Sequence, residues 1–364
     1  MNVLFFTKYP VQGASSRYRV YQYLPYLDRA GIGYSVEPFM SNEMYRLSLK
    51  NGRTAYKLWL QIEAIFRRFG VMWRCRDYDL VFMQRECLPG GPLVLERWFK
   101  WLKKVTVFDY DDALFIYKPN TFSPLANLFK NPKRIWAIMR RVDCVLAGND
   151  WLRDKAASYC SDSRTFYVAE DLDRYTLRPY EQTASTVTIG WLGSPSTEKY
   201  LNLIRPALRS VSEKYPEVCL KIIGGGGFTD PGIAVEHVPW SLEDEVAQLH
   251  SFDIGIMPLP LEEWSRGKSG GKARTCMAVG VPVVCTRIGF NEELIRDRET
   301  GYLVDSIEDW VQVLSTLIES PELRRKVGCA ARKEVARRFA LDTLGPEFAN
   351  ILSGLIFANR ARRP

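Results

Sequence analysis

The chain has 364 residues, a length that fits two domains better than one. Its 46% hydrophobic and 25% charged content is typical of a globular protein, and no apolar run reaches the roughly 20 residues of a membrane-spanning helix. The eight cysteines form no C-x-x-C pair and only two histidines are present. This composition argues against a zinc site and favours reduced thiols in the cytoplasm.

Short apolar runs alternate with amphipathic stretches in the first half of the chain. The opening MNVLFFTKYP lacks a basic leader and a cleavage site, so it predicts a buried first strand rather than a signal peptide. The alternation predicts a parallel sheet with helices on both faces. We expect strands at 3–6, 34–38, 80–83, 105–108, 144–147 and 165–168, and helices at 17–30, 53–69, 91–102, 132–141 and 150–159.

A glycine turn follows the first strand. Gly13 opens the run GASSR (13–17), at the first strand-to-helix crossover, which commonly faces a phosphate in such domains. Arg17 and Arg19 could contact an anion there, whereas the serine pair is equally consistent with helix capping. The spacing is not G-x-G-x-x-G, so a dinucleotide site is not indicated.

An acidic run follows the fourth strand. Asp109, Asp111 and Asp112 place three carboxylates at a strand end. They could position sugar hydroxyls, accept a proton or bind a metal. The alternative is a structural role, in which they cap or form a turn before the next element. A metal is the weaker option, because no second acidic cluster matches this one.

Positive charge is concentrated in the first half. Residues 1–180 hold 28 Lys and Arg against 18 Asp and Glu, whereas the remainder has a net charge of −2. Basic residues interleaved with Trp, Phe and Leu suit an anionic membrane surface, although amphipathic helices with solvated lysines would look the same. No DNA- or RNA-binding signature is present, so we expect no nucleic acid partner. We expect a cytoplasmic protein, with an anionic membrane surface as a candidate partner. The basic stretches are 45–76, 97–104 and 130–141.

A second alternating region follows a polar stretch. We expect a first domain at 1–170, a linker at 171–186 and a second domain at 187–340, with ligands bound between the carboxyl ends of the two sets of strands. No sequence repeat links the halves. Strands are expected at 187–191, 219–223, 234–238, 254–257, 281–285 and 302–304, and helices at 197–214, 241–250, 271–279, 307–318, 321–337 and 341–357.

Residues 264–286 carry the most informative motif. Arg266, Lys268 and Lys272 flank Ser269-Gly270-Gly271, at the expected start of a helix. Glycines admit a ligand close to the backbone, and the first amides of a helix favour an anion. Together with the cations they predict a diphosphate site, although a solvated basic loop before a buried helix is the alternative.

Other strand ends of the second half supply candidate contacts to a nucleoside or a sugar. The strand near 223 ends in four glycines (224–227), which could lie against a nucleoside or form a flexible turn. Val238 and Trp240 end the next strand, and Trp240 could border a base or belong to the core. Gly193 lies in GWLGSPSTEK, and Lys199 in the helix after it is either a phosphate partner or a surface lysine.

Four segments of the chain resemble glycosyltransferase family 4, the retaining "glycosyl transferases group 1" enzymes of the GT-B fold. FDIGIMPLPLEEWSRGKSGGKARTCMAVGVPVVCT is similar to the donor-site segment of that family, and GFNEELIRDRETGYLV is similar to its later G-x-x-E motif. DLDRY resembles the linker motif of the family, and residues 1–31 resemble the opening of its acceptor domain. The resemblance covers essentially the whole chain and is weakest at 40–80.

The chain departs from the family pattern at three places. The two glutamates usual in the donor site correspond here to Gly267 and Thr275, and the common arginine after the strand that opens the second domain corresponds to Trp191. The histidine often found near the FDYDDA position is also absent. The run RGKSGGK looks like a variant of this site, with the cationic role moved to Arg266, Lys268 and Lys272.

The resemblance implies two doubly wound Rossmann-like α/β domains whose parallel sheets face a central cleft, with a C-terminal helix (341–364) packed back on the first domain. It implies transfer of a sugar from a nucleoside diphosphate sugar to a hydroxyl of a glycan or lipid-linked saccharide, with retention and without a metal or other cofactor. A nucleotide-sugar epimerase and a non-catalytic nucleotide- or membrane-binding module remain alternatives. The expected catalytic residues are Arg266, Lys268, Asp111 and Asp112, the diphosphate ligands are Gly13, Arg17, Ser269, Gly270, Gly271 and Lys272, and the nucleoside or sugar contacts are Gly193, Lys199, Gly224, Val238, Trp240, Glu263 and Thr275.

Overall fold

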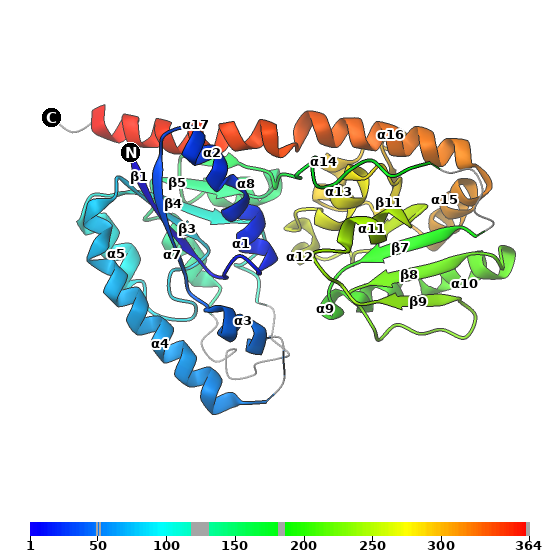
Figure 1. Cartoon of the computed structure of the whole chain (residues 1–364), viewed down its shortest axis with the longest axis horizontal. Coiled ribbons are helices and arrows are strands. Elements are labelled where there is room, and N and C mark those ends of the chain that lie inside the picture. Colours follow the sequence, from blue (N-terminus) through cyan, green and yellow to red (C-terminus); the bar gives the residue numbers. More distant parts are fainter. Residues whose placement is uncertain (49, 51, 118–130, 181–185, 362–364) are drawn as a thin grey trace. The chain divides into compact units, whose positions relative to one another are not determined.

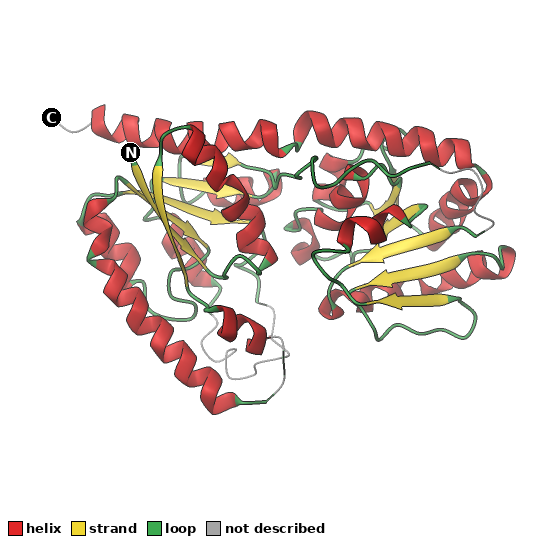
Figure 2. Ribbon diagram, viewed as in Figure 1, coloured by secondary structure: helices red, strands yellow, loops and turns green. Residues whose placement is uncertain are grey.

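A computed structural model describes residues 1–48, 50, 52–117, 131–180 and 186–361. The chain divides into two compact units, Met1–Ala169 together with the segment from Leu341, and Glu170–Ala340. Each unit is an α/β structure built on a six-stranded parallel sheet, as Figures 1 and 2 show. The expected fold class of two doubly wound α/β units is therefore confirmed. Among the described helices, none combines the length and the hydropathy that a membrane span requires.

The sheet of the first unit has the order β2-β1-β3-β4-β5-β6, and all neighbouring strands are parallel. Its strands are β1 (Asn2–Thr7), β2 (Gly33–Pro38), β3 (Leu80–Gln84), β4 (Val105–Tyr110), β5 (Cys144–Ala147) and β6 (Ser163–Thr165). Its described helices are α1 (Ala14–Arg19), α2 (Leu24–Arg29), α3 (Asn42–Ser48), α4 (Thr54–Met72), α5 (Val94–Trp101), α7 (Lys133–Met139), α8 (Asp150–Ala157) and α17 (Leu341–Ala361), with 3-10 turns η1 (Tyr21–Tyr23) and η2 (Arg74–Asp77).

The two faces of this sheet are covered by different helices. On one face, Phe348 of α17 contacts four aromatic rings at centroid distances of 4.8–6.3 Å, those of Phe5, Tyr23, Phe82 and Phe166. On the other face, Phe6 of β1 stacks on Phe99 of α5, and α4 also packs there. Alternate residues of β1 thus point to opposite faces, as strand geometry requires, and α17 lies beside α2 in Figure 1.

The sheet of the second unit has the order β12-β11-β10-β7-β8-β9, again with parallel pairs. Its strands are β7 (Thr188–Leu192), β8 (Cys219–Ile223), β9 (Val235–Val238), β10 (Ile254–Met257), β11 (Val283–Thr286) and β12 (Tyr302–Val304). Its described helices are α9 (Pro195–Glu198), α10 (Arg205–Lys214), α11 (Glu245–His250), α12 (Glu263–Arg266), α13 (Gly271–Ala278), α14 (Phe290–Leu294), α15 (Ile307–Glu319) and α16 (Pro321–Arg338), with the 3-10 turn η3 (Lys199–Ile204).

The expected elements differ from the observed ones mainly at their ends. The last strand of the first unit lies at Ser163–Thr165, before the expected range of 165–168. The expected helix at 241–250 begins only at Glu245, because the hydroxyl of Ser241 accepts the amide of Asp244 and closes a turn first. The short helices α3, α12 and α14 were not expected, since fewer than two turns carry little periodicity.

The stretch expected to be a linker has ordered structure over most of its length. Tyr175 is buried, and the amide of Arg178 donates to the carbonyl of Val279 at 2.9 Å, so residues 170–180 pack within the second unit. Residues 181–185 of that stretch lie outside the described residues.

Candidate functional site

The carboxyl edge of the sheet in the second unit brings together the turns after several strands. β7 pairs with β8 on one side and with β10 on the other. The strand order therefore runs toward one edge of the sheet from β7 to β9 and toward the other edge from β10 to β12, and it reverses beside β7. Ligands of open α/β sheets bind at such a switch point, outside the carboxyl ends of the strands. The turn at Gly193 follows β7, and the segment leading to α13 follows β10.

Lys272 joins these two segments. It lies in the first turn of α13, and its Nζ donates to Oγ1 of Thr197 in α9 at 2.9 Å. The same ammonium lies 4.6 Å from the ring centroid of Trp191, at the end of β7. Burial and the neighbouring charge of Lys268 lower the pKa of Lys272 to about 7. Its described partners are neutral, so the site holds a cation whose charge an anion would stabilise.

The turn before α13 has a backbone that glycine favours. Gly270 is the N-cap of the helix with φ of 63°, and a Cβ there would lie 2.6 Å from the ring of Phe290. Because Gly270 has no side chain to cap the first amides of α13, these amides are suited to donate hydrogen bonds to an anion.

A buried ion pair holds this turn from behind. Nε of Arg274 donates to Oε1 of Glu170 at 2.9 Å, and its Nη1 donates to the carbonyl of Ser269 at 2.7 Å. The hydroxyl of Thr275 donates to the carbonyl of Gly271 at 2.8 Å and lies 3.4 Å from the same carboxylate oxygen. Burial raises the pKa of Glu170 to about 7, against the lowering effect of Arg274. The pair therefore fixes the loop that carries the predicted diphosphate ligands.

The glycine turn after β8 lies directly against the turn after β7. Gly224 has φ of 78°, and a Cβ there would lie 2.3 Å from the carbonyl oxygen of Gly193. The carboxylate of Glu198 accepts the amides of Gly226, Gly227 and Phe228 at 2.9–3.1 Å. Although partial burial raises the pKa of Glu198, these backbone hydrogen bonds lower it more, so it stays ionised. This carboxylate orders the loop that sequence reasoning treated as flexible or ligand-binding.

Trp240 borders the same turns. The amide of Gly224 donates to the carbonyl of Val238 at 2.9 Å, and a Cβ at Gly224 would lie 3.1 Å from Cβ of Trp240. The indole Nε1 of Trp240 donates to Glu245, whose other oxygen accepts the hydroxyl of Tyr175. Trp240 is thus held at its edge while much of its surface stays exposed.

The remaining predicted residues of the second unit lie around this cluster or apart from it. Glu263 and Arg266 are exposed on α12, and Lys199 is exposed beside the ring of Tyr200. Lys268 is half-buried, with its ammonium 4.9 Å from the ring centroid of Trp264. The structure therefore brings together Gly193, Gly224, Val238, Trp240, Ser269, Gly270, Gly271, Lys272 and Thr275.

In the first unit, the glycine turn and the acidic run meet. A Cβ at Gly13 would lie 2.3 Å from Cβ of Tyr9, so the turn has room only for glycine. The hydroxyl of Ser15 donates to both carboxylate oxygens of Asp111 at 3.1 and 3.0 Å. Gln84, at the end of β3, donates to the same hydroxyl at 3.1 Å and accepts the hydroxyl of Ser16 at 2.9 Å.

Arginines neutralise the acidic run. Arg85 donates to Asp112 at 2.8 Å and lies 3.5 Å from Asp111. Arg19, considered above as an anion ligand, is instead fully buried and paired with Asp109, so it cannot reach a ligand. Burial raises the pKa of Asp109 to about 6 despite this partner. Arg17 is half-buried, with its guanidinium 5.2 Å from the ring centroid of Tyr18.

A metal site would need several His, Cys, Asp or Glu side chains close together. Within the described residues, no three His, Cys, Asp or Glu side chains come together as candidate metal ligands.

Sequence reasoning missed the residues that support the site from behind. Glu170, Thr197, Glu198 and Arg274 contact the predicted residues but carry no motif that marks them. Glu198 had one usable signal, because an acid placed after a small-residue turn in SPSTEK is suited to accept backbone amides. The Glu170–Arg274 pair spans 104 residues, and a single sequence contains no signal for it.

Known proteins resemble part of this chain in sequence. Residues 186–320 match the family model "Glycosyl transferases group 1". A D-inositol 3-phosphate glycosyltransferase of Arthrobacter sp. (strain FB24) is 33% identical over 112 residues, which cover 30% of this chain and 25% of that protein. The sulfoquinovosyl transferase SQD2 of Arabidopsis thaliana is 30% identical over 158 residues, covering 40% and 29%. The chain thus spans only a quarter to two fifths of the length of the curated relatives it matches.

Solved structures match over nearly the whole chain. A glycosyltransferase from Rickettsia africae has a TM-score of 0.70 at 14% identity and covers 98% of both chains. Anabaena HepE in complex with UDP and glucose has a TM-score of 0.68 at 17% identity, covering 97% of this chain and 99% of that one. At this identity the match shows the fold, which is GT-B. The chain therefore carries, at residues 186–320, a domain of the glycosyl transferases group 1 family, as the sequence resemblance indicated.

Proposed function

We propose that this protein transfers a glycosyl unit from a nucleoside diphosphate sugar to an acceptor hydroxyl. The observation that carries the proposal is Lys272, which joins the start of α13 to the segment after β7 at the switch point of the sheet. A half-buried ammonium with neutral described partners, beside the first amides of a helix, is suited to an anion such as a diphosphate.

The proposed chemistry follows from where charge develops. Cleavage of the anomeric C–O bond leaves negative charge on the departing nucleoside diphosphate. Lys272 and the backbone amides of residues 270–272 would stabilise that charge, with Lys268 and Arg266 adding to the positive potential. Each such donor lowers a barrier by roughly 2–4 kcal/mol, judging from the removal of oxyanion-hole donors in other enzymes.

The donor class is suggested by the relatives. HepE structures contain UDP and UDP-glucose, and the matched curated proteins are named as glycosyl and sulfoquinovosyl transferases. A uridine diphosphate sugar is therefore the first donor to test. In this proposal the nucleoside lies along Gly193, Gly224 and Trp240, whose ring edge is already held by Glu245. Lys199, Glu263 and Thr275 remain candidates for secondary contacts.

The acceptor side of the proposal rests on the first unit. Asp111 or Asp112 would orient the acceptor hydroxyl, and Gly13 and Arg17 would face the leaving diphosphate. We propose retention of anomeric configuration without a metal ion. The proposed acceptor is a glycan or a lipid-linked saccharide, with the protein working in the cytoplasm at the inner surface of the cell membrane.

Ligand-induced thermal stabilisation tests the donor part of this proposal. The purified protein is heated with UDP, UDP-glucose, other nucleoside diphosphates and their sugars. A ligand at a hundred times its Kd stabilises by about 2.7 kcal/mol, which raises Tm by about 3–4 °C in a protein of this size. Lys272→Met should cut the shift to about half or less, and Lys326→Met, at an exposed position of α16, should keep it.

Turnover tests the transfer itself. Release of nucleoside diphosphate should rise when lipid-linked saccharides are added as acceptors and should persist in a chelator. A panel without a single stabilising nucleotide would remove the donor assignment. Tight nucleotide binding with no release of sugar, under every acceptor tried, would favour a binding module over a transferase.

A further inference from the structure

Helix α4 has two apolar faces, and only one of them packs on its unit. The packed face buries residues at i, i+4 and i+11, namely Leu60, Ala64 and Val71. A second face follows the spacing i, i+4, i+7, i+8, i+11 on the opposite side of the helix, where an apolar stripe is expected only if a partner covers it. Its residues are between 36% and 72% exposed and are Leu58, Ile62, Ile65, Phe66 and Phe69. We call these five residues the outer face of α4.

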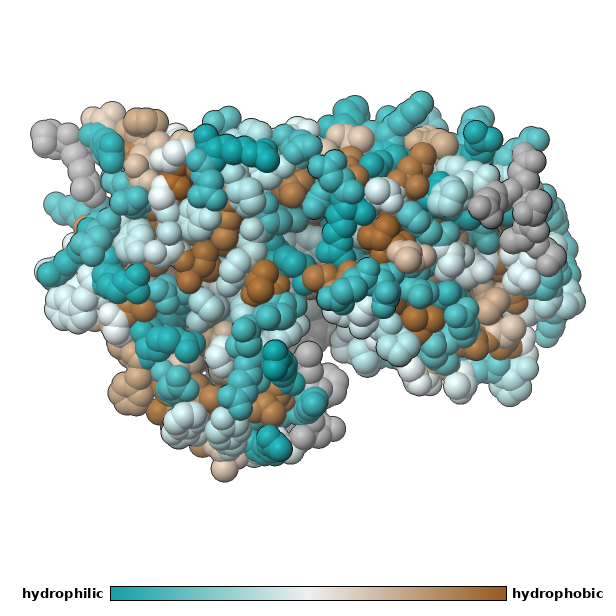
Figure 3. All heavy atoms as spheres, viewed as in Figure 1, coloured by the Kyte–Doolittle hydropathy of each residue, from teal (hydrophilic) through white to brown (hydrophobic). Residues whose placement is uncertain are grey.

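Exposed tryptophans extend this face along its whole length. Trp59 lies near the start of α4, Trp73 directly after its end, and Trp101 at the end of α5, and each is 56–67% exposed. Trp98 links the last two, with ring centroids 5.2 Å from Trp73 and 4.8 Å from Trp101. In Figure 3, hydrophobic side chains reach the surface at the lower left, over α4. Tryptophan prefers the boundary between lipid and water.

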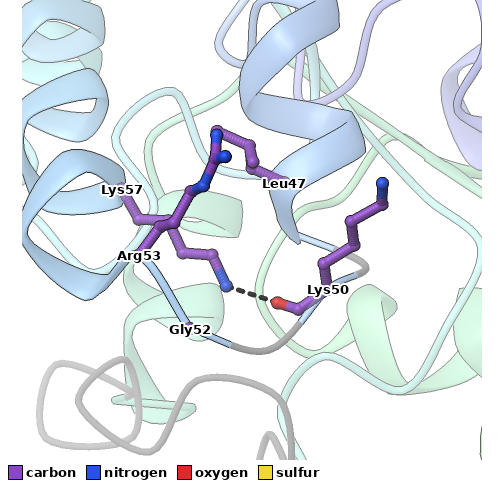
Figure 4. A pocket seen from close by; sticks show the side chains of 5 residues that line it. All are labelled: Leu47, Lys50, Gly52, Arg53 and Lys57. Carbon is purple, nitrogen blue, oxygen red and sulfur yellow. Dashed lines mark hydrogen bonds between the residues drawn. The ribbon is translucent and has the colours of Figure 1, made fainter.

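The surroundings of the outer face are strongly basic. Residues 54–76 and 97–104 hold nine Lys and Arg against one acid, Glu63, and eight of these cations are exposed or half-buried, the exception being the buried Arg68. The guanidinium of Arg76 lies 4.8 Å from the ring centroid of Trp73. At the other end of α4, a cavity of about 170 Å³ is lined by the basic side chains Lys50, Arg53 and Lys57 together with Leu47 and Gly52 (Figure 4).

We propose that the outer face of α4, with Trp73 and Trp101, is a docking surface for an anionic lipid bilayer. The helix lies along the membrane, its outer face enters the head-group region, and the flanking cations contact lipid phosphates. The charge argues against a second copy of this chain as the occupant, because a symmetric contact would place eight exposed or half-buried cations near eight like charges. This inference gives a surface to the proposed membrane location, but it does not require the sugar transfer.

Vesicle binding without any nucleotide tests the proposal. The protein is sedimented with phosphatidylcholine vesicles and with vesicles that also contain phosphatidylglycerol. We expect binding to the anionic vesicles to be at least about tenfold tighter and to weaken in high salt. Tryptophan emission should shift to the blue on binding.

A matched pair of double variants locates the surface. Ile62→Ser with Phe66→Ser should lower the partition onto anionic vesicles by about tenfold or more. Leu203→Ser with Phe357→Ser removes two apolar side chains of comparable exposure, 46% and 57%, and should change it less than about twofold. Thermal melting of both variants checks that they fold.

Three results would overturn the assignment. The first is equal binding to neutral and anionic vesicles, and the second is unchanged binding of the Ile62/Phe66 variant. The third is a parent protein that forms an oligomer and binds no vesicles, together with an Ile62/Phe66 variant that is a monomer and a Leu203/Phe357 variant that is not. This result would make the outer face of α4 a contact between copies of the chain. A protein that binds vesicles but no nucleotide would leave this inference standing and refute the proposed function instead.

Discussion

Replacement of Lys272 by methionine should remove the pH dependence of donor binding. Methionine keeps the length and apolar stem of the side chain, so it can still pack beside Trp191, but it has no charge and no donor for Thr197. The proposed diphosphate site would then lose a charge-assisted hydrogen bond, which contributes about 1.5–3 kcal/mol. The affinity for UDP-glucose at pH 6 should fall by about 10- to 100-fold.

The effect should shrink as pH rises. The pKa of Lys272 in the free protein is about 7, because burial and Lys268 lower it, so the ammonium is charged at pH 6 and mostly neutral at pH 8.5. A bound diphosphate raises that pKa, so binding above pH 7 takes up a proton. If only the charged form binds tightly, linkage predicts that the affinity of the parent protein falls by about 30-fold between pH 6 and pH 8.5.

Isothermal titration with UDP-glucose in buffers of different ionisation enthalpy measures both the affinity and the number of protons taken up on binding. UDP-glucose is the suitable ligand because its two phosphates stay fully ionised across this range. Proton uptake should approach one per site at pH 8 in the parent protein and in Lys326→Met, and should vanish in Lys272→Met. The reasoning would be refuted by an affinity that is flat with pH in the parent protein, or by the same slope in the methionine variant.

Two stability predictions follow from other buried cations. Arg274→Met leaves Glu170 buried without its partner, at a cost of about 3–5 kcal/mol. The pKa of Glu170 is already about 7 and rises further without Arg274. At pH 8 the carboxyl of the folded variant therefore keeps its proton, whereas the carboxyl of the unfolded chain loses it. The loss of unfolding free energy, measured by urea unfolding, should thus be larger at pH 8 than at pH 5. Arg68→Met removes the donor to the carbonyls of Thr7, Glu37 and Cys87, and should cost about 2–4 kcal/mol. Arg67→Met removes hydrogen bonds to the carbonyls of Pro38 and Phe39 from a more exposed side chain and should cost about 1 kcal/mol, and equal losses for the two arginines would contradict this account.

The fold was readable from the sequence wherever burial alone decides the pattern. The strands at 144–147 and 254–257 were predicted to the residue, because central parallel strands are continuous apolar runs between turn residues. The helix ends were less predictable. At Ser241, a local hydrogen bond between the side chain and the backbone competes with the helix and delays its start, and this outcome depends on packing that a single sequence does not specify.

Of the candidate site, the sequence indicated only the residues at the strand ends. Glycines and cations at strand ends pointed to Gly193, Gly224 and Lys272, because their conformational freedom and charge are properties of the residues themselves. Their partners were not predictable, since Glu198 and Glu170 act through contacts with residues 28 and 104 positions away. Arg19 shows the reverse error, because its place beside a glycine turn suggests a ligand while its environment makes it part of the core.

The buried and half-buried cations of this chain differ in one respect that bears on function. Arg19 is paired with Asp109, and Arg274 with Glu170, so each of these charges is compensated inside its own unit. Arg68 is surrounded by carbonyl oxygens of the strand ends that it joins. The described partners of Lys272 are a hydroxyl and an indole ring, which stabilise a full charge far less than a carboxylate does. A folded protein that keeps such a lysine at the carboxyl edge of its sheet retains an unfavourable charge that an incoming anion relieves. This lack of a compensating partner, more than the number of basic residues, identifies the proposed site for the diphosphate.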